Sequence, residues 1–204
     1  MSDTVPAIVP HGRFEEILAA VGDLKDQARP WNGMGFRFAA VSHAAPGKIL
    51  SGRGSQEYGG RWNAAGTFPA VYCSLLPETA VSESMNRFRR SGLKPLSPLP
   101  GVLVSIEIKL HKVLDLSQPG DRMALDPFLA KAKKENWQKL QDQGREAFGH
   151  AIGRAVWQLG LEGILFSSVV VQDGGNLCIY PDNLHSKSML RIENESILRK
   201  YVLE

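Results

Sequence analysis

The sequence predicts an α+β fold: a single domain in which a mixed, mainly antiparallel sheet is flanked by helices. Helix-like and strand-like stretches are interspersed along the chain, without the regular alternation that builds a parallel sheet. With 204 residues, 43% of them hydrophobic, the chain is long enough for one well-buried core, and a second domain would be small. We expect an N-terminal helical extension at residues 1–34 and one main domain at residues 35–204.

The first half of the chain predicts a helix, a strand and a loop. Five apolar residues at helical spacing indicate a leading helix that stops before Pro30: Phe14, Ile17, Leu18, Val21 and Leu24. Residues 35–41 favour a strand, in which the charge of Arg37 needs a partner. Residues 43–60 are rich in Gly, Ser, Pro and charge, which is typical of a surface loop.

The second half predicts further strands and two helices. Residues 102–110 alternate between apolar and polar, as a strand with one buried face does, and 113–116 fit a short continuation. Asp126 as N-cap and Pro127 at the first helical position start a helical stretch that we expect to run toward Gln143. A second amphipathic helix spans 148–159 and closes at Gly160, and strand-like runs follow at 163–171, 176–180 and 188–192.

Composition excludes several classes of protein. A formal net charge of +3 is too small to require nucleic acid as a partner. No phosphate-binding GxxxxGK[ST] motif occurs, and the five histidines are scattered without metal-ligand spacing, so we expect no metal site. A Ser-His-Asp triad stays open, because folding alone brings such residues together. Three lysines are most simply a solvated helix face, with a contact surface as the alternative: Lys131, Lys133 and Lys134.

The two cysteines and the N-terminus indicate a cytoplasmic protein. Cys73 and Cys178 each lie in an apolar, strand-like run, which favours buried free thiols over a disulfide. The first residues lack the charged start and apolar core of a secretion signal. No stretch approaches the ~20 apolar residues that span a bilayer, so we expect no membrane association.

The stretch from Tyr58 to Glu83 carries the strongest indication of a site. Arg61, Tyr72 and Glu83 follow one another at steps of eleven residues. A loop, a short strand and a helix opened by Pro77 are predicted to carry these three side chains in turn. A cation, a phenol and a carboxylate on three different elements are typical of a functional site held by a rigid scaffold.

These residues, with two later segments, resemble the RES domain family, which is named for its Arg, Glu and Ser. The resemblance covers about residues 36–180 and rests on Phe36-Arg37, Gly60-Arg61-Trp62-Asn63, Tyr72, Glu83, Gly163-Ile164-Leu165-Phe166-Ser167-Ser168 and Asn176-Leu177-Cys178-Ile179-Tyr180. Members known as bacterial toxins degrade NAD with an architecture similar to that of ADP-ribosyltransferase toxins. They are commonly held in check by an Xre-like helix-turn-helix antitoxin.

The resemblance implies a role for each matched residue. Arg37, Glu83 and Ser168 would be catalytic, and NAD would be bound by Arg37, Arg61, Asn63, Tyr72 and Ser168. Arginine suits bidentate phosphate contacts, and a carboxylate stabilises the cation that develops at a ribose during glycosidic cleavage. The family often has Pro then Ser after the apolar strand. Ser167 takes the place of that Pro here, so Ser167 and Ser168 are both candidates, and we favour Ser168.

The function implied is cleavage of the nicotinamide–ribose bond of NAD, with transfer of ADP-ribose to inorganic phosphate or water. NAD would be a substrate, phosphate a possible co-substrate, and no cofactor would be bound permanently. Two alternatives stay open: an ADP-ribosyltransferase that modifies a macromolecule, and a non-catalytic module that binds NAD or a partner protein. The expected partner is an Xre-like antitoxin, through which alone the protein would meet nucleic acid, and a homodimer is possible.

Overall fold

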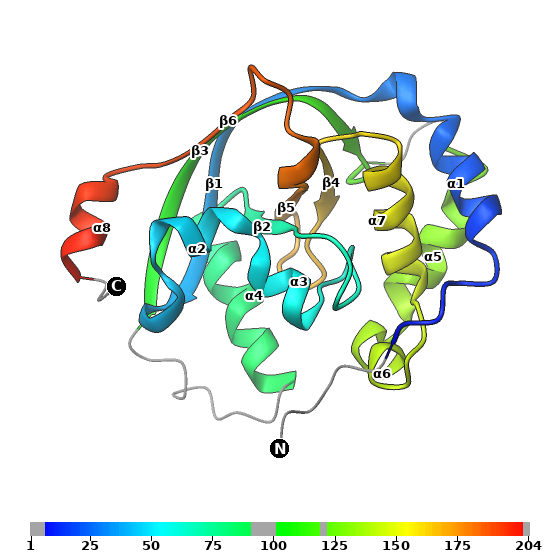
Figure 1. Cartoon of the computed structure of the whole chain (residues 1–204), viewed down its shortest axis with the longest axis horizontal. Coiled ribbons are helices and arrows are strands. Elements are labelled where there is room, and N and C mark those ends of the chain that lie inside the picture. The colour runs from blue at the N-terminus through cyan, green and yellow to red at the C-terminus, as the bar shows by residue number, and fades with distance from the viewer. Residues whose placement is uncertain (1–6, 91–100, 119–121, 202–204) are drawn as a thin grey trace.

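The computed structural model describes residues 7–90, 101–118 and 122–201. Figure 1 shows a sheet with helices grouped at its two ends. The strands are β1 Arg29–Ala40, β2 Val71–Ser74, β3 Gly101–Asp115, β4 Gly163–Ser167, β5 Gly175–Ile179 and β6 Met189–Ile192. The helices are α1 Phe14–Gly22, α2 Pro46–Ser51, α3 Arg53–Tyr58, α4 Pro77–Arg90, α5 Asp126–Lys134, α6 Trp137–Asp142, α7 Phe148–Gln158 and α8 Glu195–Tyr201.

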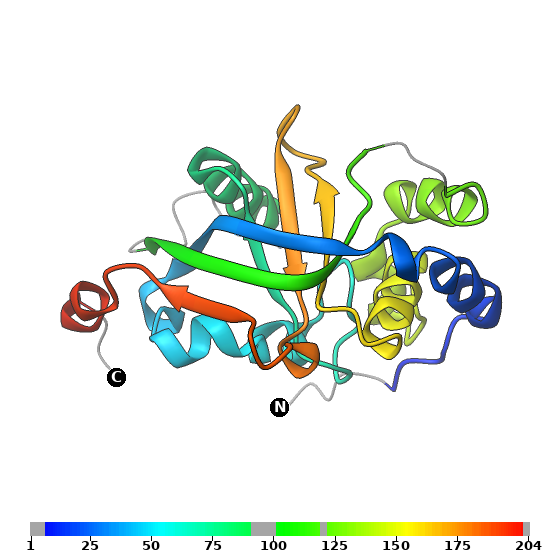
Figure 2. The ribbon, with the colours of Figure 1, turned by 90° about the horizontal axis from the view of Figure 1, so that it is seen from above.

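Five of the strands form a closed circuit. β1 runs antiparallel to β3 over almost its whole length, β3 runs parallel to β4, and β4, β5 and β2 continue as antiparallel neighbours. One residue pair, Phe36 with Ser74, joins β2 back to β1. β6 adds to β3 from outside the circuit. Figure 2 shows β1 and β3 lying crosswise over β4 and β5. The expected mixed, mainly antiparallel sheet is therefore confirmed.

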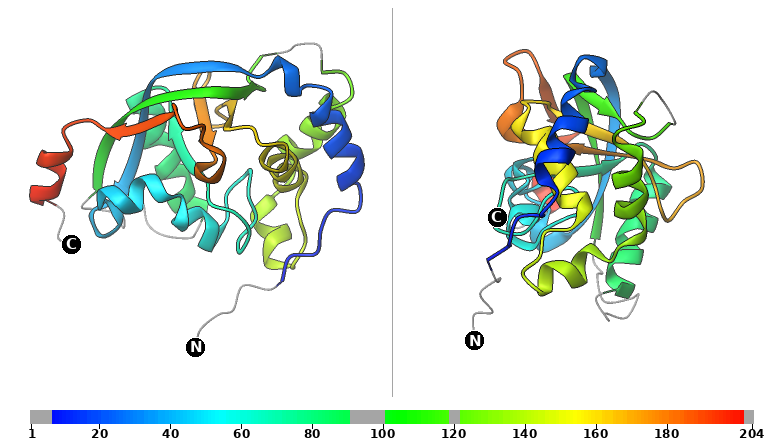
Figure 3. Two further views of the ribbon diagram at one scale, coloured as in Figure 1. Left: turned by 45° about the horizontal axis from the view of Figure 1, so that its top comes forward. Right: turned by 90° about the vertical axis from the view of Figure 1, so that its right-hand side faces the viewer.

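The sheet formed by β2, β5 and β4 has a hydrophobic core on each face. Alternate residues of β5 mark the two faces: Cys178 belongs to one core and Leu177 to the other. The first core is covered by α1, α5 and α7, which lie together in Figures 1 and 3. The second lies between this sheet and the strands β1 and β3, where a Cβ on Gly35 would meet both Cys73 and Ile108.

The predicted surface loop at 43–60 is wrong, because it contains the short helices α2 and α3. The two helices meet at Gly52, whose positive φ of 68° and approach to the backbone of Ala70 favour glycine. Ile49 anchors α2 in the second core and is 1% exposed. Helices this short carry too few apolar residues for a periodic pattern, so composition favoured a loop.

The predicted helix toward Gln143 is two helices. α5 ends at Lys134, and α6 begins after Asn136, whose side-chain oxygen accepts a hydrogen bond from the amide of Lys139 at 3.1 Å. That N-cap starts a new helix axis instead of continuing the first. The strand expected at 163–171 ends at Ser167. Strand β1 begins at Arg29, and β1 therefore crosses the predicted boundary between residues 34 and 35.

The segment before α1 is attached to the main body. The amide of Val9 donates to the carbonyl of Gly144 at 2.8 Å, and the amide of His11 donates to Glu146 Oε2 at 2.6 Å. Arg154 on α7 binds both oxygens of Glu146 at 2.7 Å and lies over the ring of Phe14, 3.3 Å from its centroid. The first helix thus packs against α7 within the first core. None of the described helices has the length and apolar character needed to cross a bilayer.

Candidate active site

Strand register places three side chains in one row on the face of the first core. Ser74 on β2 is paired with Asn176 on β5, which is paired with Phe166 on β4. Directly paired residues point to the same face of a sheet, and so do residues two apart on one strand, such as Tyr72 and Ser74. Together with Tyr72, this row forms the floor of the candidate site, which combines aromatic rings with polar groups.

Glu83 reaches this row from α4. Its Oε1 accepts two hydrogen bonds, one from the Ser168 hydroxyl at 2.7 Å and one from the Asn176 amide nitrogen at 2.9 Å. The Ser74 hydroxyl in turn donates to Asn176 Oδ1 at 2.6 Å. Glu83 is half-buried, whereas Ser74 and Asn176 are buried. The structure therefore unites two of the predicted catalytic residues, Glu83 and Ser168, although 85 positions separate them.

Ser168 opens a tight loop between β4 and β5. Its amide donates to the carbonyl of Gly174 at 2.6 Å, and its hydroxyl oxygen accepts the amides of Val170 and Val171, both at 3.0 Å. Ser167 behaves differently, because its hydroxyl donates to the carbonyl of Ser117 at 2.9 Å. Of the two candidate serines, Ser168 is the one in contact with Glu83.

Tyr72 holds the turn that carries Arg61. Its phenol oxygen accepts the amide of Trp62 at 2.9 Å and donates to Asn63 Oδ1 at 2.8 Å. The phenol lies so close to Gly60 that a Cβ there would be 2.5 Å from it. Asn63 is fully buried, and its Nδ2 donates to the carbonyls of Ser55 and Phe68. Both ends of the Asn63 carboxamide are thus engaged within the protein.

Arg37 approaches β2 from the side of β1. It is half-buried, and its Nη1 lies 3.5 Å from the carbonyl oxygen of Tyr72, at the limit of a hydrogen bond. Its charge also acts on the neighbouring thiol: burial raises the pKa of Cys73 to about 12, and Arg37 opposes that rise. The structure places Arg37 beside the strand that carries Tyr72 and Ser74.

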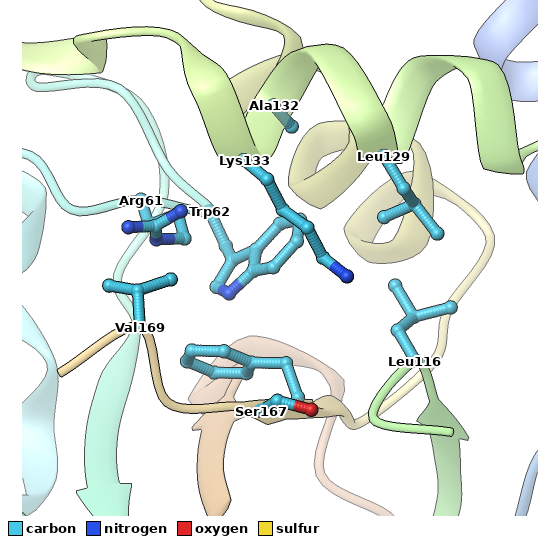
Figure 4. Close-up of a pocket in the computed structure, with 9 residues that line it drawn as sticks. Arg61, Trp62, Leu116, Leu129, Ala132, Lys133, Ser167 and Val169 are labelled. Atoms are coloured by element: carbon cyan, nitrogen blue, oxygen red, sulfur yellow. The ribbon is translucent and has the colours of Figure 1, made fainter. Parts of the chain in front are cut away.

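Arg61 lines a small recess of about 30 Å³, shown in Figure 4. Trp62 and Phe166 line it, with their rings edge to face at 5.3 Å, and Lys133 reaches it from α5. The indole nitrogen of Trp62 is buried, and none of the described residues accepts a hydrogen bond from it. The residues that line the recess include two cations and no carboxylate, so the recess favours an anionic ligand.

Backbone contact with α7 fixes the position of this recess. Gly149 and Gly153 lie one turn apart on α7, and a Cβ on either would run into a carbonyl oxygen of the Arg61-Trp62 segment, at 2.6 and 1.7 Å. Only glycine allows helix and loop to approach so closely. Sequence reasoning did not identify this role of the two glycines.

The three lysines of α5 separate in the structure. Lys133 lines the recess, whereas the ammonium of Lys131 lies 5.1 Å from the centroid of the Phe148 ring. All three are exposed, as expected of a solvated face, but one of them also belongs to the recess.

Both cysteines are free and buried, as predicted, and burial raises the pKa of the Cys178 thiol as well. Within the described part of the chain, no group of three or more His, Cys, Asp or Glu side chains could hold a metal ion.

The site residues predicted from the sequence do not include two members of the hydrogen-bonded cluster around Glu83. Ser74 lies two residues after Tyr72 on the same strand, and Asn176 is the one polar side chain among the apolar residues of β5. Both signals were visible, because a polar side chain on the buried face of a strand needs a partner. The register of β2 against β5, which pairs them, is visible only in the fold.

The fold and the cluster define a single-domain α+β protein whose candidate site is built around one helix carboxylate beside strands β2, β5 and β4. The chain belongs to the RES domain family, whose model matches residues 36–196. The expected resemblance is therefore confirmed.

Curated relatives and a solved structure agree with this placement. The NAD(+) phosphorylase MbcT of Mycobacterium tuberculosis is 26% identical over 137 residues, which cover 66% of this chain and 67% of that protein. The protein of the same name from Mycobacterium bovis matches equally. The crystal structure of the M. tuberculosis MbcT-MbcA toxin-antitoxin complex aligns with a TM-score of 0.63 and 19% identity, over 92% of this chain and 97% of the other. That similarity concerns the fold.

Proposed function

We propose that this protein cleaves the nicotinamide–ribose bond of NAD in the cytoplasm and passes the ADP-ribosyl group to inorganic phosphate or water. As a toxin it would deplete NAD, and its partner would be an Xre-like antitoxin. Membership in the RES family and the similarity to two NAD(+) phosphorylases support the substrate. The observation that carries the chemistry is the Glu83 carboxylate, which two donors hold at one oxygen.

The reaction needs stabilisation of positive charge on the ribose. When the bond from the ribose anomeric carbon to nitrogen breaks, the electron pair leaves with nicotinamide, and the anomeric carbon becomes cationic. An oxygen of phosphate or water then forms the new bond, and water releases one proton. A fixed carboxylate lowers the energy of such a cation most if it is oriented before the reaction. Glu83 fits this role, because the hydrogen bonds at Oε1 fix its orientation.

Cations around the floor suit the pyrophosphate of NAD. Arg61 and Lys133 meet at the recess, and Arg37 lies on the neighbouring strand. Arginine binds phosphate oxygens in a bidentate way, and lysine adds a point charge. Phe166 is half-buried on the same face and offers a ring for stacking. In this proposal Tyr72 and Asn63 act by holding the turn in place, because their polar groups are engaged there.

Glu83→Gln is a well-matched test of the proposal. Both donors contact Oε1, so glutamine keeps that acceptor and replaces only Oε2, which removes the charge without removing the two hydrogen bonds. We expect a loss of about 10²-fold or more in turnover with an unchanged melting temperature. Full activity in this variant would contradict the assignment. Glu15→Gln, an exposed carboxylate on α1, is the matched control.

The product assay uses purified protein and NAD, with and without inorganic phosphate, followed by mass spectrometry. Nicotinamide with ADP-ribose 1″-phosphate, formed only with phosphate, identifies a phosphorylase. Nicotinamide with free ADP-ribose in both conditions identifies a hydrolase. ADP-ribose retained on macromolecules indicates a transferase, and NAD that is bound but intact indicates a binding module. Size-exclusion chromatography of the same sample tests the homodimer.

A further inference from the structure

Two buried side chains connect Glu83 to the sheet. Ser74 is 4% exposed and Asn176 is 5% exposed. Ser74 donates to Oδ1 of Asn176 at 2.6 Å, and Nδ2 of Asn176 donates to Oε1 of Glu83 at 2.9 Å. The row formed by β2 and β5 thus ends in a hydrogen bond to the carboxylate on α4.

The Glu83 carboxylate fixes which way the Asn176 carboxamide faces, and the Ser74 hydroxyl satisfies the other end. A carboxamide has one accepting oxygen and one donating nitrogen, and Glu83 can only accept when it is ionised. If Asn176 turned over, its oxygen would face the carboxylate, and two acceptors would meet without a proton. In the observed orientation the Ser74 hydroxyl donates to Oδ1, so both ends of the carboxamide are hydrogen-bonded.

Asn176 and Ser168 donate to the same oxygen of Glu83. Both contacts are to Oε1, and the side chains described at 7–86, 101–118 and 122–200 make no hydrogen bond to the other oxygen, Oε2. Two donors from different strand ends fix the rotation of the carboxylate, so that Oε2 keeps one direction. A ligand would meet an oxygen whose direction is already fixed.

The geometry points to Asn176 as a positioning residue for the proposed reaction: held by Ser74, it orients Glu83 so that Oε2 meets the ribose of NAD. This inference rests on the proposed function. Asn176 does not touch substrate in this scheme, because its carboxamide is hydrogen-bonded to Ser74 and Glu83. Its contribution appears in the bond-breaking step, when charge develops on the ribose, more than in binding.

Asn176→Asp gives a signature that a merely structural residue would not. The introduced carboxyl keeps the acceptor for Ser74 and donates to Glu83 only while it carries a proton. Because two carboxylates at hydrogen-bond distance share one proton, activity should be highest at low pH and fall as the pH rises and the shared proton is lost. Asn32→Asp, on the exposed outer face of β1, should keep the wild-type pH profile.

Two further variants separate orientation from folding. Asn176→Ala should lower kcat about tenfold or more, with KM for NAD changed less than about twofold. Ser74→Ala should lower kcat about threefold to tenfold, because the buried Oδ1 of Asn176 loses its donor and the carboxamide is held less firmly. Ser188→Ala is the control, since it removes a hydroxyl from a different carboxylate, Glu162. The melting temperature of each variant gives the folded fraction used to correct kcat.

A second measurement keeps the inference independent of NAD turnover. The side-chain amide of Asn176, observed by nitrogen-15 NMR, should exchange slowly with solvent and shift in both Ser74→Ala and Glu83→Gln. If the wild-type protein leaves NAD intact, the proposed function fails, and this signal still decides whether Asn176 holds Glu83. A wild-type kcat and pH profile in Asn176→Asp, or a fast-exchanging Asn176 amide, would overturn the inference.

Discussion

The Tyr72 phenol and the Asn63 carboxamide are joined by a hydrogen bond of 2.8 Å, which ties β2 to the turn that carries Arg61. The same phenol oxygen accepts the amide of Trp62. Two successive residues of the turn, Trp62 and Asn63, are therefore held by one strand side chain. Tyr72, eleven residues after Arg61, thus binds the turn that carries this arginine.

Tyr72→Phe should loosen the turn while keeping the ring. Removing the hydroxyl leaves the buried Asn63 Oδ1 without its donor, which costs about 1–3 kcal/mol. We expect a lower melting temperature and a raised KM for NAD, because Arg61 loses its fixed position. Tyr58→Phe, an exposed tyrosine, should match the wild type in thermal unfolding and kinetics. An unchanged Tyr72→Phe protein would show that the turn is held by other contacts.

Gly153→Ala should disrupt the contact between α7 and the Arg61-Trp62 segment. A Cβ there would lie 1.7 Å from the carbonyl oxygen of Trp62, so helix and loop must separate. Overpacking of this kind typically costs about 1–3 kcal/mol. Gly54→Ala is the matched control, because nothing lies within 4 Å of its Cβ position. Urea unfolding of the two variants measures the difference directly.

Lys133→Glu should weaken NAD binding, whereas Lys134→Glu should not. Only Lys133 of this pair lines the recess with Arg61, so reversing its charge places a carboxylate against the expected phosphates. We expect KM to rise about tenfold with a smaller change in kcat. The salt dependence of KM should also be reduced in Lys133→Glu. Equal effects in the two variants would indicate a general surface charge effect.

Protonation of His150 should lower the stability of the fold in mild acid. Burial lowers the pKa of His150 to about 4, although Glu146 and the backbone of Gly60 oppose that shift. The unfolded chain takes up this proton below about pH 6.5, and the folded chain does so only near pH 4, so stability falls between these values by about 3 kcal/mol. Unfolding measured at pH 7 and pH 4.5 should show a smaller loss in His150→Gln than in the wild type. Exposed His43→Gln is the control.

The sequence predicted those parts of the protein that depend on local pattern. Pro77 correctly predicts the start of α4, and the residues of the long alternation at 102–110 lie within β3. Glu83 and Ser168 were found through family motifs, and the structure places them in contact. Periodicity alone would have predicted Glu83 to be an ordinary helix carboxylate.

What the sequence could not supply depends on tertiary pairing. Asn176 faces Glu83 only because β5 pairs with β2 in one register, and a shift of one residue would turn it to the other face. Helices α2 and α3 meet at Gly52, which packs against the backbone of Ala70, and no local pattern shows that contact. The predicted part of Asn63 in ligand binding stays a prediction, and its carboxamide contacts are to the protein itself.

The closed circuit of strands also bears on when activity begins during synthesis. Glu83 precedes its two hydrogen-bond donors, Ser168 and Asn176, by 85 and 93 residues, and β4 and β5 are needed to close the circuit. A ribosome-bound chain that has emerged only as far as α7 therefore lacks Phe166, Ser168 and Asn176. The proposed NAD-consuming activity would begin only after β4 and β5 have been synthesised.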